Sequence, residues 1–271
     1  MRRRLLVLSN GHGEDTICAA ILDKLETEAE IVAWPMIGPG HAYRDRGVAV
    51  TGPFLDPPSE GFGTLSPRLL ARDLAAGLAG GYLRQARAAR RLRGRFDLAL
   101  AAGDIVPLGA AWLARTRCIF VACAKSAHGR RGDGHGAPER WLMRRTCAAV
   151  IPRDALTAER MAAHGLPVRA PGNPMMDGTV PRAPLPAAPG VTRIACLAGS
   201  RRDAAENARC LLAAGAALAE RVPGPLELLF PVHPALDPRQ VQAGGWAPSP
   251  DPGTRVLAGP RDARAVFLHD R

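Results

Sequence analysis

Lysine, aromatic residues and long apolar runs are all scarce in this sequence. Only Lys24 and Lys125 are lysine among the 36 basic residues, and aromatic residues make up 4% of the chain. So few aromatic rings argue against the stacking platforms on which proteins bind single-stranded nucleic acid. No segment approaches the ~20 apolar residues that a membrane-spanning helix needs. Any association with a membrane is therefore expected to be peripheral.

Metal and redox motifs are missing as well. The chain has no Asp-any-Asp pair, the usual carboxylate cradle for a metal-bound nucleotide sugar, and no CxxC pair. We therefore predict no bound metal and no cofactor. Five of the six cysteines lie inside apolar patterns and are expected to be small core residues of a protein in the reducing cytoplasm. These five are Cys18, Cys118, Cys147, Cys196 and Cys210.

The net charge of +11 favours anionic partners. Phosphorylated substrates, anionic lipid surfaces and nucleic acid all fit such a charge. The densest basic run, 84–95, would place charge on nearly every face of a helix, so a solvated helix surface is favoured. Contact with anionic lipid comes second, and no nucleic acid partner is expected.

Short apolar runs alternate with longer helical patterns along the chain. This alternation is typical of parallel sheets covered by helices on both faces, an α/β fold. Strands are predicted at 5–8, 31–33, 98–102, 119–122, 148–151, 194–197, 226–232 and 256–258. Helices are predicted at 16–25, 67–92, 106–114, 155–164, 204–221 and 261–269.

A proline-rich stretch divides the chain. The sequence PRAPLPAAP at 181–189 holds four prolines and predicts a stiff, extended linker. We expect domains at 1–180 and 191–271, joined by a linker at 181–190. The second is expected to be incomplete at its C-terminus, because no strand follows the helix predicted at 261–269.

Two glycine-rich turns follow predicted strands. In ACLAGSRRDAAEN, which ends at Asn207, a strand gives way to Gly199, Ser200 and Arg201 and then to a helix. Such a turn can bind phosphate through free amides and an arginine, although an ordinary turn capped by serine fits equally well. In SNGHGED, at 9–15, two glycines allow close approach of a ligand, but this is no GxGxxG dinucleotide motif.

Polar residues follow other predicted strands. Asp104 lies where open parallel sheets present catalytic groups, and it could act as a general base or simply cap the next helix. Lys125 also follows a strand. His128 and His135 flank the RRGDGHG loop, for which a mobile surface loop is favoured over a metal site. Asn173 precedes a proline and is expected to be extended, and His233 lies between prolines after a strand, where it could contact a ligand or be an ordinary loop histidine.

The motifs SNGHGED, AAGDIVPLG, ERWLMRR, PRDALTAE, PGNPMMDG and ACLAGSRRDAAEN, in this order, resemble those of lipid-A-disaccharide synthase-related proteins. The resemblance covers essentially the whole chain. It implies a GT-B architecture of two Rossmann-like domains and Asp104 as general base. The acceptor would be bound by Asn10, Gly11, Gly13, Asp15 and Lys125, and the donor by Asn173, Gly199, Ser200, Arg201, Asn207 and His233.

The resemblance implies an inverting, metal-independent glycosyltransferase that moves a sugar from a UDP-sugar to a lipid-linked or amphipathic acceptor. Its expected location is the cytoplasm, at the inner face of the membrane. The first glycine loop departs from the synthase, and the chain ends before a nucleotide-binding segment, so impaired catalysis is expected. A sugar-nucleotide epimerase or hydrolase of the same fold and a basic module that binds anionic lipid are the alternatives.

Overall fold

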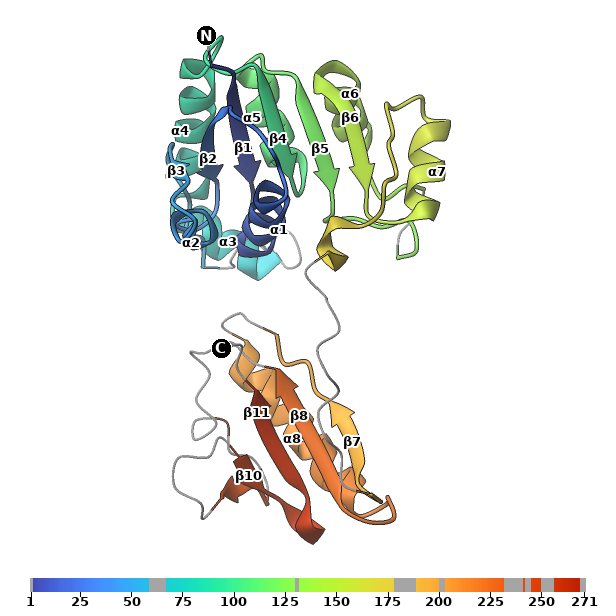
Figure 1. Cartoon of the computed structure of the whole chain (residues 1–271). Coiled ribbons are helices and arrows are strands. Elements are labelled where there is room, and N and C mark those ends of the chain that lie inside the picture. The colour runs from blue at the N-terminus through green and yellow to red at the C-terminus, as the bar shows by residue number, and fades with distance from the viewer. Residues whose placement is uncertain are drawn as a thin grey trace. The chain divides into compact units, whose positions relative to one another are not determined.

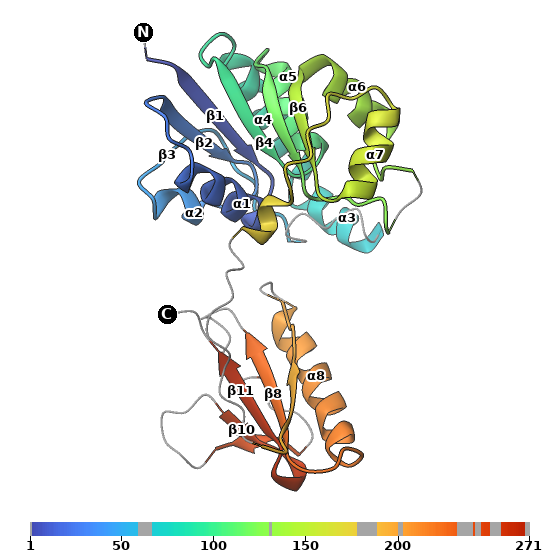
Figure 2. The ribbon, with the colours of Figure 1, turned by 45° about the vertical axis from the view of Figure 1, so that its right-hand side comes forward.

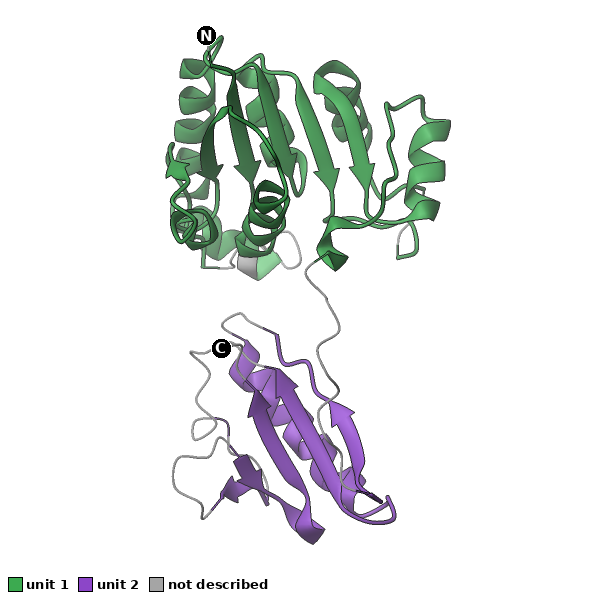
Figure 3. Cartoon of the chain, in the orientation of Figure 1, with its two compact units in different colours: residues 1–180 green, residues 181–271 purple. Residues whose placement is uncertain are grey.

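The chain forms two compact units, at Met1–Val180 and Pro181–Arg271 (Figure 3). The computed structural model describes residues 2–58, 67–129, 132–177, 189–199, 203–231, 241, 245–249 and 256–268. Each unit has its own sheet and its own buried core.

Unit 1 is built on a six-stranded parallel sheet (Figure 1). Its strands lie in the order β3-β2-β1-β4-β5-β6, which is the Rossmann order. The strands are β1 (Arg4–Ser9), β2 (Glu30–Pro35), β3 (Ala49–Val50), β4 (Leu98–Ala102), β5 (Cys118–Ala122) and β6 (Cys147–Pro152). Because all strands are parallel, their carboxyl ends meet at one edge, toward which the arrowheads in Figure 1 point.

Helices cover both faces of this sheet (Figure 2). They are α1 (His12–Asp23), α2 (His41–Arg44), α3 (Pro67–Ala75), α4 (Leu78–Arg91), α5 (Ile105–Leu113), α6 (Ala137–Thr146) and α7 (Ala155–Ala163). Side chains alternate across a strand. Accordingly, Leu6 and Leu8 of β1 join the core beneath α4, α5 and α6, whereas Leu5 and Val7 join the core beneath α1 and α2.

Unit 2 has a mixed sheet in the order β7-β8-β11-β10-β9, with helix α8 (Ala204–Ala219). The strands are β7 (Thr192–Ala195), β8 (Leu226–Pro231), β9 (Ala247–Pro248), β10 (Val256–Ala258) and β11 (Arg264–Leu268). β7, β8 and β11 are parallel, whereas β9 and β10 join by antiparallel pairing.

The α/β alternation is confirmed, but three predictions from the sequence are wrong. The helix expected at 261–269 is the strand β11, in which Ala265 and Phe267 are buried and Phe267 stacks on Phe230 at 4.8 Å. The helix expected at 67–92 is two helices, α3 and α4, because Gly77 adopts a left-handed conformation between them. Cys210 is exposed rather than buried, whereas the other five cysteines are buried.

Candidate functional site

The carboxyl edge of the unit 1 sheet brings together residues that are far apart in the sequence. Asn10 follows β1, Asp104 follows β4 and Lys125 follows β5. The Asn10 Nδ2 group donates a hydrogen bond to Asp104 Oδ1 at 3.0 Å, across 94 residues of sequence. The first two of these residues therefore lie in direct contact, at the edge where parallel sheets bind ligands.

Asp104 caps helix α5 and is held in one orientation. Its Oδ1 atom accepts a hydrogen bond from the Val106 backbone at 2.9 Å. Burial raises the pKa of the Asp104 carboxyl, and the negative charge of Glu139 raises it further. Hydrogen bonds from Val106 and Asn10 and the charge of Lys125 oppose that rise in pKa without cancelling it. Asp104 therefore caps α5 and also has a carboxylate with an increased affinity for a proton.

Two glycines make room for the side chain of Glu14 at this edge. Gly11 and Gly103 have φ values of 155° and 118°, which side-chain-bearing residues rarely adopt. A Cβ atom on Gly11 would lie 2.8 Å from Glu14 Oε2, and one on Gly103 would lie 3.3 Å from Glu14 Cγ. The negative charge of Glu14 also helps raise the pKa of Cys123, which burial mainly shifts to about 12. Glu14 thus lies among the loops that follow β1, β4 and β5.

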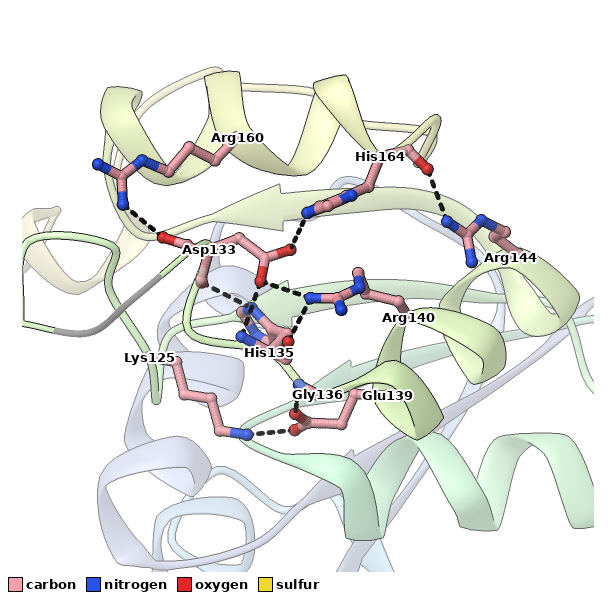
Figure 4. Close-up of polar contacts among 10 residues, drawn as sticks. Lys125, Asp133, His135, Gly136, Glu139, Arg140, Arg144, Arg160 and His164 are labelled. Carbon is pink, nitrogen blue, oxygen red and sulfur yellow. Dashed lines mark hydrogen bonds and ion pairs between the residues drawn. The ribbon is translucent and has the colours of Figure 1, made fainter.

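Lys125 forms an ion pair with Glu139 of α6, with 2.5 Å between Nζ and Oε1 (Figure 4). The Lys125 and Glu139 side chains are 21% and 7% exposed, so water screens the pair little. The other Glu139 oxygen accepts the Gly136 backbone N–H at 2.9 Å and so caps α6. Glu139 begins the ERWLMRR motif, and no role for it was predicted from the sequence. The signal was there, since a glutamate at the third helical position after a proline is typical of a capped helix start.

The segment 132–136 is anchored, contrary to the surface loop expected from the sequence. Asp133 is fully buried and His135 is 6% exposed. Asp133 Oδ1 accepts hydrogen bonds from Arg140 Nη1 at 3.0 Å and from the His135 backbone at 2.9 Å. Arg160 binds the carbonyl of Gly132 at 2.6 Å (Figure 4). Burial lowers the pKa of His135, which favours a neutral imidazole.

Three further predicted residues of unit 1 are Asp15 and Gly13 on α1 and Asn173 near the end of the unit. The Asp15 carboxyl is 1% exposed and accepts a 2.5 Å hydrogen bond from Ser9, and burial raises its pKa to about 7. This carboxyl is therefore buried within the unit, and its predicted role in acceptor binding stays a prediction. Gly13 is exposed on the first turn of α1. Asn173 is extended, as expected, and its side chain accepts the Met175 backbone N–H at 3.0 Å.

In unit 2, the structure describes only part of the predicted donor site. Gly199 has φ +87°, which favours glycine. Asn207 donates to the Ala198 carbonyl at 3.1 Å and so ties α8 to the segment after β7. Ser200, Arg201 and His233 lie outside the described residues. The roles predicted for all of these residues stay predictions.

An apolar groove of about 210 Å³ runs between α4 and α5, beginning beside Asp104. Met36, Tyr82, Ile105, Val106 and Gly109 are among the residues that line it. The charge of Asp104 contributes to the raised pKa of Tyr82, after the larger effect of burial. The edge of the sheet thus combines a carboxylate with a surface suited to an apolar chain.

Among the described residues, no group of three or more His, Cys, Asp and Glu side chains is placed to hold a metal ion. No helix within the described ranges is both long enough and apolar enough to cross a membrane.

Known proteins match this chain in structure but not in sequence. No model of a protein family matches, and no curated protein does either. The S. aureus protein MnaA, solved with UDP, matches with a TM-score of 0.56 and 14% identity, over 89% of this chain and 64% of its own. A candidate UDP-N-acetylglucosamine 2-epimerase from Listeria monocytogenes matches with a TM-score of 0.53 and 15% identity, over 89% and 65%.

A third match is the UDP-GlcNAc 2-epimerase of Neisseria meningitidis bound to UDP-GlcNAc, with a TM-score of 0.50 and 12% identity over 88% of this chain and 67% of that one. The chain thus spans less than two thirds of the first two proteins. At such low identity these likenesses concern the fold alone. They show that the chain has the two-domain α/β architecture of the GT-B fold.

Proposed function

We propose that the protein is a UDP-sugar-dependent enzyme that transfers the sugar, with inversion, to a lipid-linked or amphipathic acceptor. This is the reaction implied by the resemblance to lipid-A-disaccharide synthase-related proteins. In the proposed reaction, unit 1 binds the acceptor and unit 2 binds the donor. The observation that carries it is the Asp104 carboxylate, held by Asn10 and Val106 at the carboxyl edge of the sheet, with its pKa raised.

Asp104 is the proposed general base. An inverting transfer needs a group that takes the proton from the acceptor hydroxyl as this oxygen attacks the anomeric carbon. A carboxylate with a raised pKa takes that proton more readily, and general base catalysis typically contributes 10²- to 10⁴-fold. Asn10 fixes the carboxylate of Asp104. The Oδ1 atom of Asn10 is buried without a hydrogen-bond partner among the described residues, and we propose that it accepts a hydrogen bond from a substrate hydroxyl.

The groove between α4 and α5 is the proposed site for the apolar part of the acceptor. It starts at Ile105 and Val106, which follow Asp104 directly, and apolar side chains dominate its lining. An amphipathic acceptor could place its alkyl chain there and its sugar hydroxyl at Asp104. We also propose that the protein acts while bound peripherally to an anionic membrane, because such an acceptor is presented at the lipid surface.

We assign the donor phosphates to the Gly199-Ser200-Arg201 sequence, which stands between β7 and α8 in the chain. Helix N-termini and arginine both favour phosphate. The choice of UDP as the nucleotide is supported by proteins of the same fold, of which one was solved with UDP and another with UDP-GlcNAc.

A second candidate is a UDP-sugar 2-epimerase, which two of the matched structures favour. Such a reaction needs no acceptor. It could use Glu139 and His135, which lie close enough to interact electrostatically. The two reactions therefore differ in their products and in their dependence on the acceptor.

The test is product analysis under single-turnover conditions, with the protein in excess over UDP-GlcNAc, with and without an alkyl glycoside acceptor. We expect an acceptor-dependent disaccharide glycoside and UDP. Asp104→Asn should lower the transfer rate at least 100-fold while leaving the unfolding temperature unchanged, because asparagine also caps helices. Formation of a C2 epimer without acceptor would instead support the epimerase.

Asp154→Asn is the matched control. Asp154 caps α7 after β6 as Asp104 caps α5 after β4, accepting the Thr157 backbone N–H at 2.8 Å. Burial tends to raise the pKa of Asp154, but hydrogen bonds from Thr157 and Ser126 outweigh this and lower it. We expect the Asp154 variant to keep its transfer rate. Equal losses in both variants would show that loss of a carboxylate after a strand, and not loss of the general base, explains the effect of Asp104→Asn.

A further inference from the structure

The opposite edge of the unit 1 sheet carries a polar cavity of about 410 Å³. Arg117 and Thr146 line it and directly precede β5 and β6, whereas Asp104 and Lys125 follow β4 and β5. In a parallel sheet these positions lie at opposite edges. This cavity, here called the arginine pocket, is therefore separate from the proposed catalytic site.

Four arginines line the arginine pocket: Arg93, Arg115, Arg117 and Arg145. All four are exposed, and within the described part of the chain none of them has a carboxylate at ion-pair distance. Arg93 uses its Nε to donate to the Leu113 carbonyl at 2.9 Å. The remaining guanidinium donors stay available. A cavity lined by unpaired charges of one sign attracts counter-ions.

The negative C-terminal ends of nearby helices do not neutralise these four arginines. The helices α4, α5 and α6 end near the pocket, and each C-terminus carries about half a negative charge. Together they amount to about −1.5, against the four positive charges of the arginines. An excess of positive charge is left over.

Two further features point to a ligand. Thr146 lines the pocket and is 4% exposed, yet its hydroxyl has no hydrogen-bond partner among the described residues. Buried polar groups nearly always have a hydrogen-bond partner, so this hydroxyl is available to bond a ligand. Arg115 has φ +54° just after α5, where glycine is favoured. The chain thus retains an arginine at a position that disfavours any side chain.

Aromatic rings lie next to these charges. Trp112 lines the pocket and packs edge-on against Trp141 with ring centroids 5.6 Å apart, and both are 44% exposed. Arg145 lies over the Trp141 ring at 5.7 Å. Exposed tryptophan beside arginine suits a phosphate that is attached to an organic group, because the rings offer it an apolar contact.

We propose that the arginine pocket binds the phosphate group of a phosphorylated organic ligand. Arginine matches phosphate through parallel N–H donors, and the Thr146 hydroxyl supplies one more. Either a soluble phosphomonoester or a phospholipid head group carries this chemistry. The proposal does not depend on the glycosyl transfer proposed above.

The test is titration calorimetry of the full chain with glycerol 3-phosphate, with glycerol as a blank, together with co-sedimentation on vesicles of phosphatidylglycerol or phosphatidylcholine. The variant Arg115→Gly/Arg145→Gln removes two pocket arginines. Glycine suits the left-handed backbone at position 115, so we expect no loss of thermal stability. Binding should weaken at least tenfold. Arg87→Gln removes one exposed arginine of α4 outside the pocket and is the control for loss of charge elsewhere; it should bind within twofold of the wild type.

The two arms identify the source of the phosphate. Binding of glycerol 3-phosphate that the double variant loses indicates a soluble ligand. If the protein sediments with phosphatidylglycerol vesicles but does not bind glycerol 3-phosphate, and the double variant loses this sedimentation, the ligand is a lipid head group. The proposal is overturned if neither probe binds, if the double variant binds like the wild type, or if Arg87→Gln weakens binding equally. Asp104→Asn should leave both measurements unchanged, which separates this result from the fate of the proposed activity.

Discussion

Asp104 shows how one carboxylate can serve both the fold and a reaction. The same oxygen accepts hydrogen bonds from the Val106 backbone and the Asn10 side chain. Its pKa depends on burial and on two neighbours of opposite charge, Glu139 and Lys125. Since those neighbours are themselves an ion pair, changing either one exposes Asp104 to the unbalanced charge of the other.

This arrangement predicts opposite effects of two neutralising variants on the Asp104 pKa. Lys125→Gln leaves the negative Glu139, so the pKa of Asp104 should rise; Glu139→Gln leaves the positive Lys125, so it should fall. The two shifts should therefore have opposite signs. Carboxyl ¹³C NMR titration measures them directly. If transfer is active, the acidic limb of its pH profile should move the same way, because the base must be deprotonated.

Shifts in the same direction, or none, would contradict the electrostatic account. Glu159→Gln, on α7, is a matched loss of one negative charge, because Glu159 is not among the groups that shift the pKa of Asp104.

Asp104 was predicted as a site residue because it follows an apolar strand, and parallel strands end at one edge. Asn10 was predicted only through the family resemblance. The sequence did not predict the Lys125–Glu139 pair. Glu139 reaches Lys125 only because Asp133, His135 and Arg140 anchor the segment before α6. These contacts join residues whose glycine-rich surroundings carry no helical or strand period. The local pattern therefore favoured a surface loop.

At the scale of elements, the helix α4 contains two adjacent glycines in different environments. Gly80 is exposed, and a Cβ atom there would meet only Arg84 Nη1, at 3.8 Å. Gly81 is buried, and a Cβ atom there would overlap Leu55 Cδ2. One face of the helix thus tolerates a side chain that the other excludes.

We therefore predict that Gly80→Ala stabilises the protein by about 0.5–1 kcal/mol, because alanine loses less conformational entropy than glycine in a helix. Gly81→Ala gains the same amount but must displace the buried Leu55, so a net destabilisation of about 1 kcal/mol is expected. The midpoints of urea unfolding should move in opposite directions. Equal stabilisation by both would mean that Leu55 moves aside freely.

Element types were predictable where the period was clear. The strands at 98–102 and 256–258 match the structure residue for residue. The helix predicted at 261–269 is wrong because the alternation of buried and less buried residues in β11 spans only five residues, too short to mark a strand in the sequence. The burial of this strand depends on the ring of Phe230, 37 residues earlier in the chain, which local sequence does not reveal.

At the scale of the whole molecule, the two units have separate cores. Leu108 is fully buried in the core of unit 1, and Phe230 is fully buried in that of unit 2. Cores of this kind usually unfold as cooperative units. The proline-rich stretch at 181–189 indicated two domains, but only the structure assigns these residues to their cores.

Two cores predict two thermal transitions in differential scanning calorimetry. Leu108→Ala should destabilise unit 1 by about 2–5 kcal/mol and Phe230→Ala should destabilise unit 2 by about 3–5 kcal/mol, because each leaves a cavity in one core. Leu108→Ala should therefore lower the transition of unit 1 by roughly 4–20 °C, and Phe230→Ala should lower that of the smaller unit 2 by at least about 12 °C. Each should leave the other transition within about 2 °C. A single transition lowered alike by both variants would instead show that the chain unfolds as one cooperative body. In that case the separation of the cores would have no thermodynamic counterpart, since a cavity in either core would then destabilise the other.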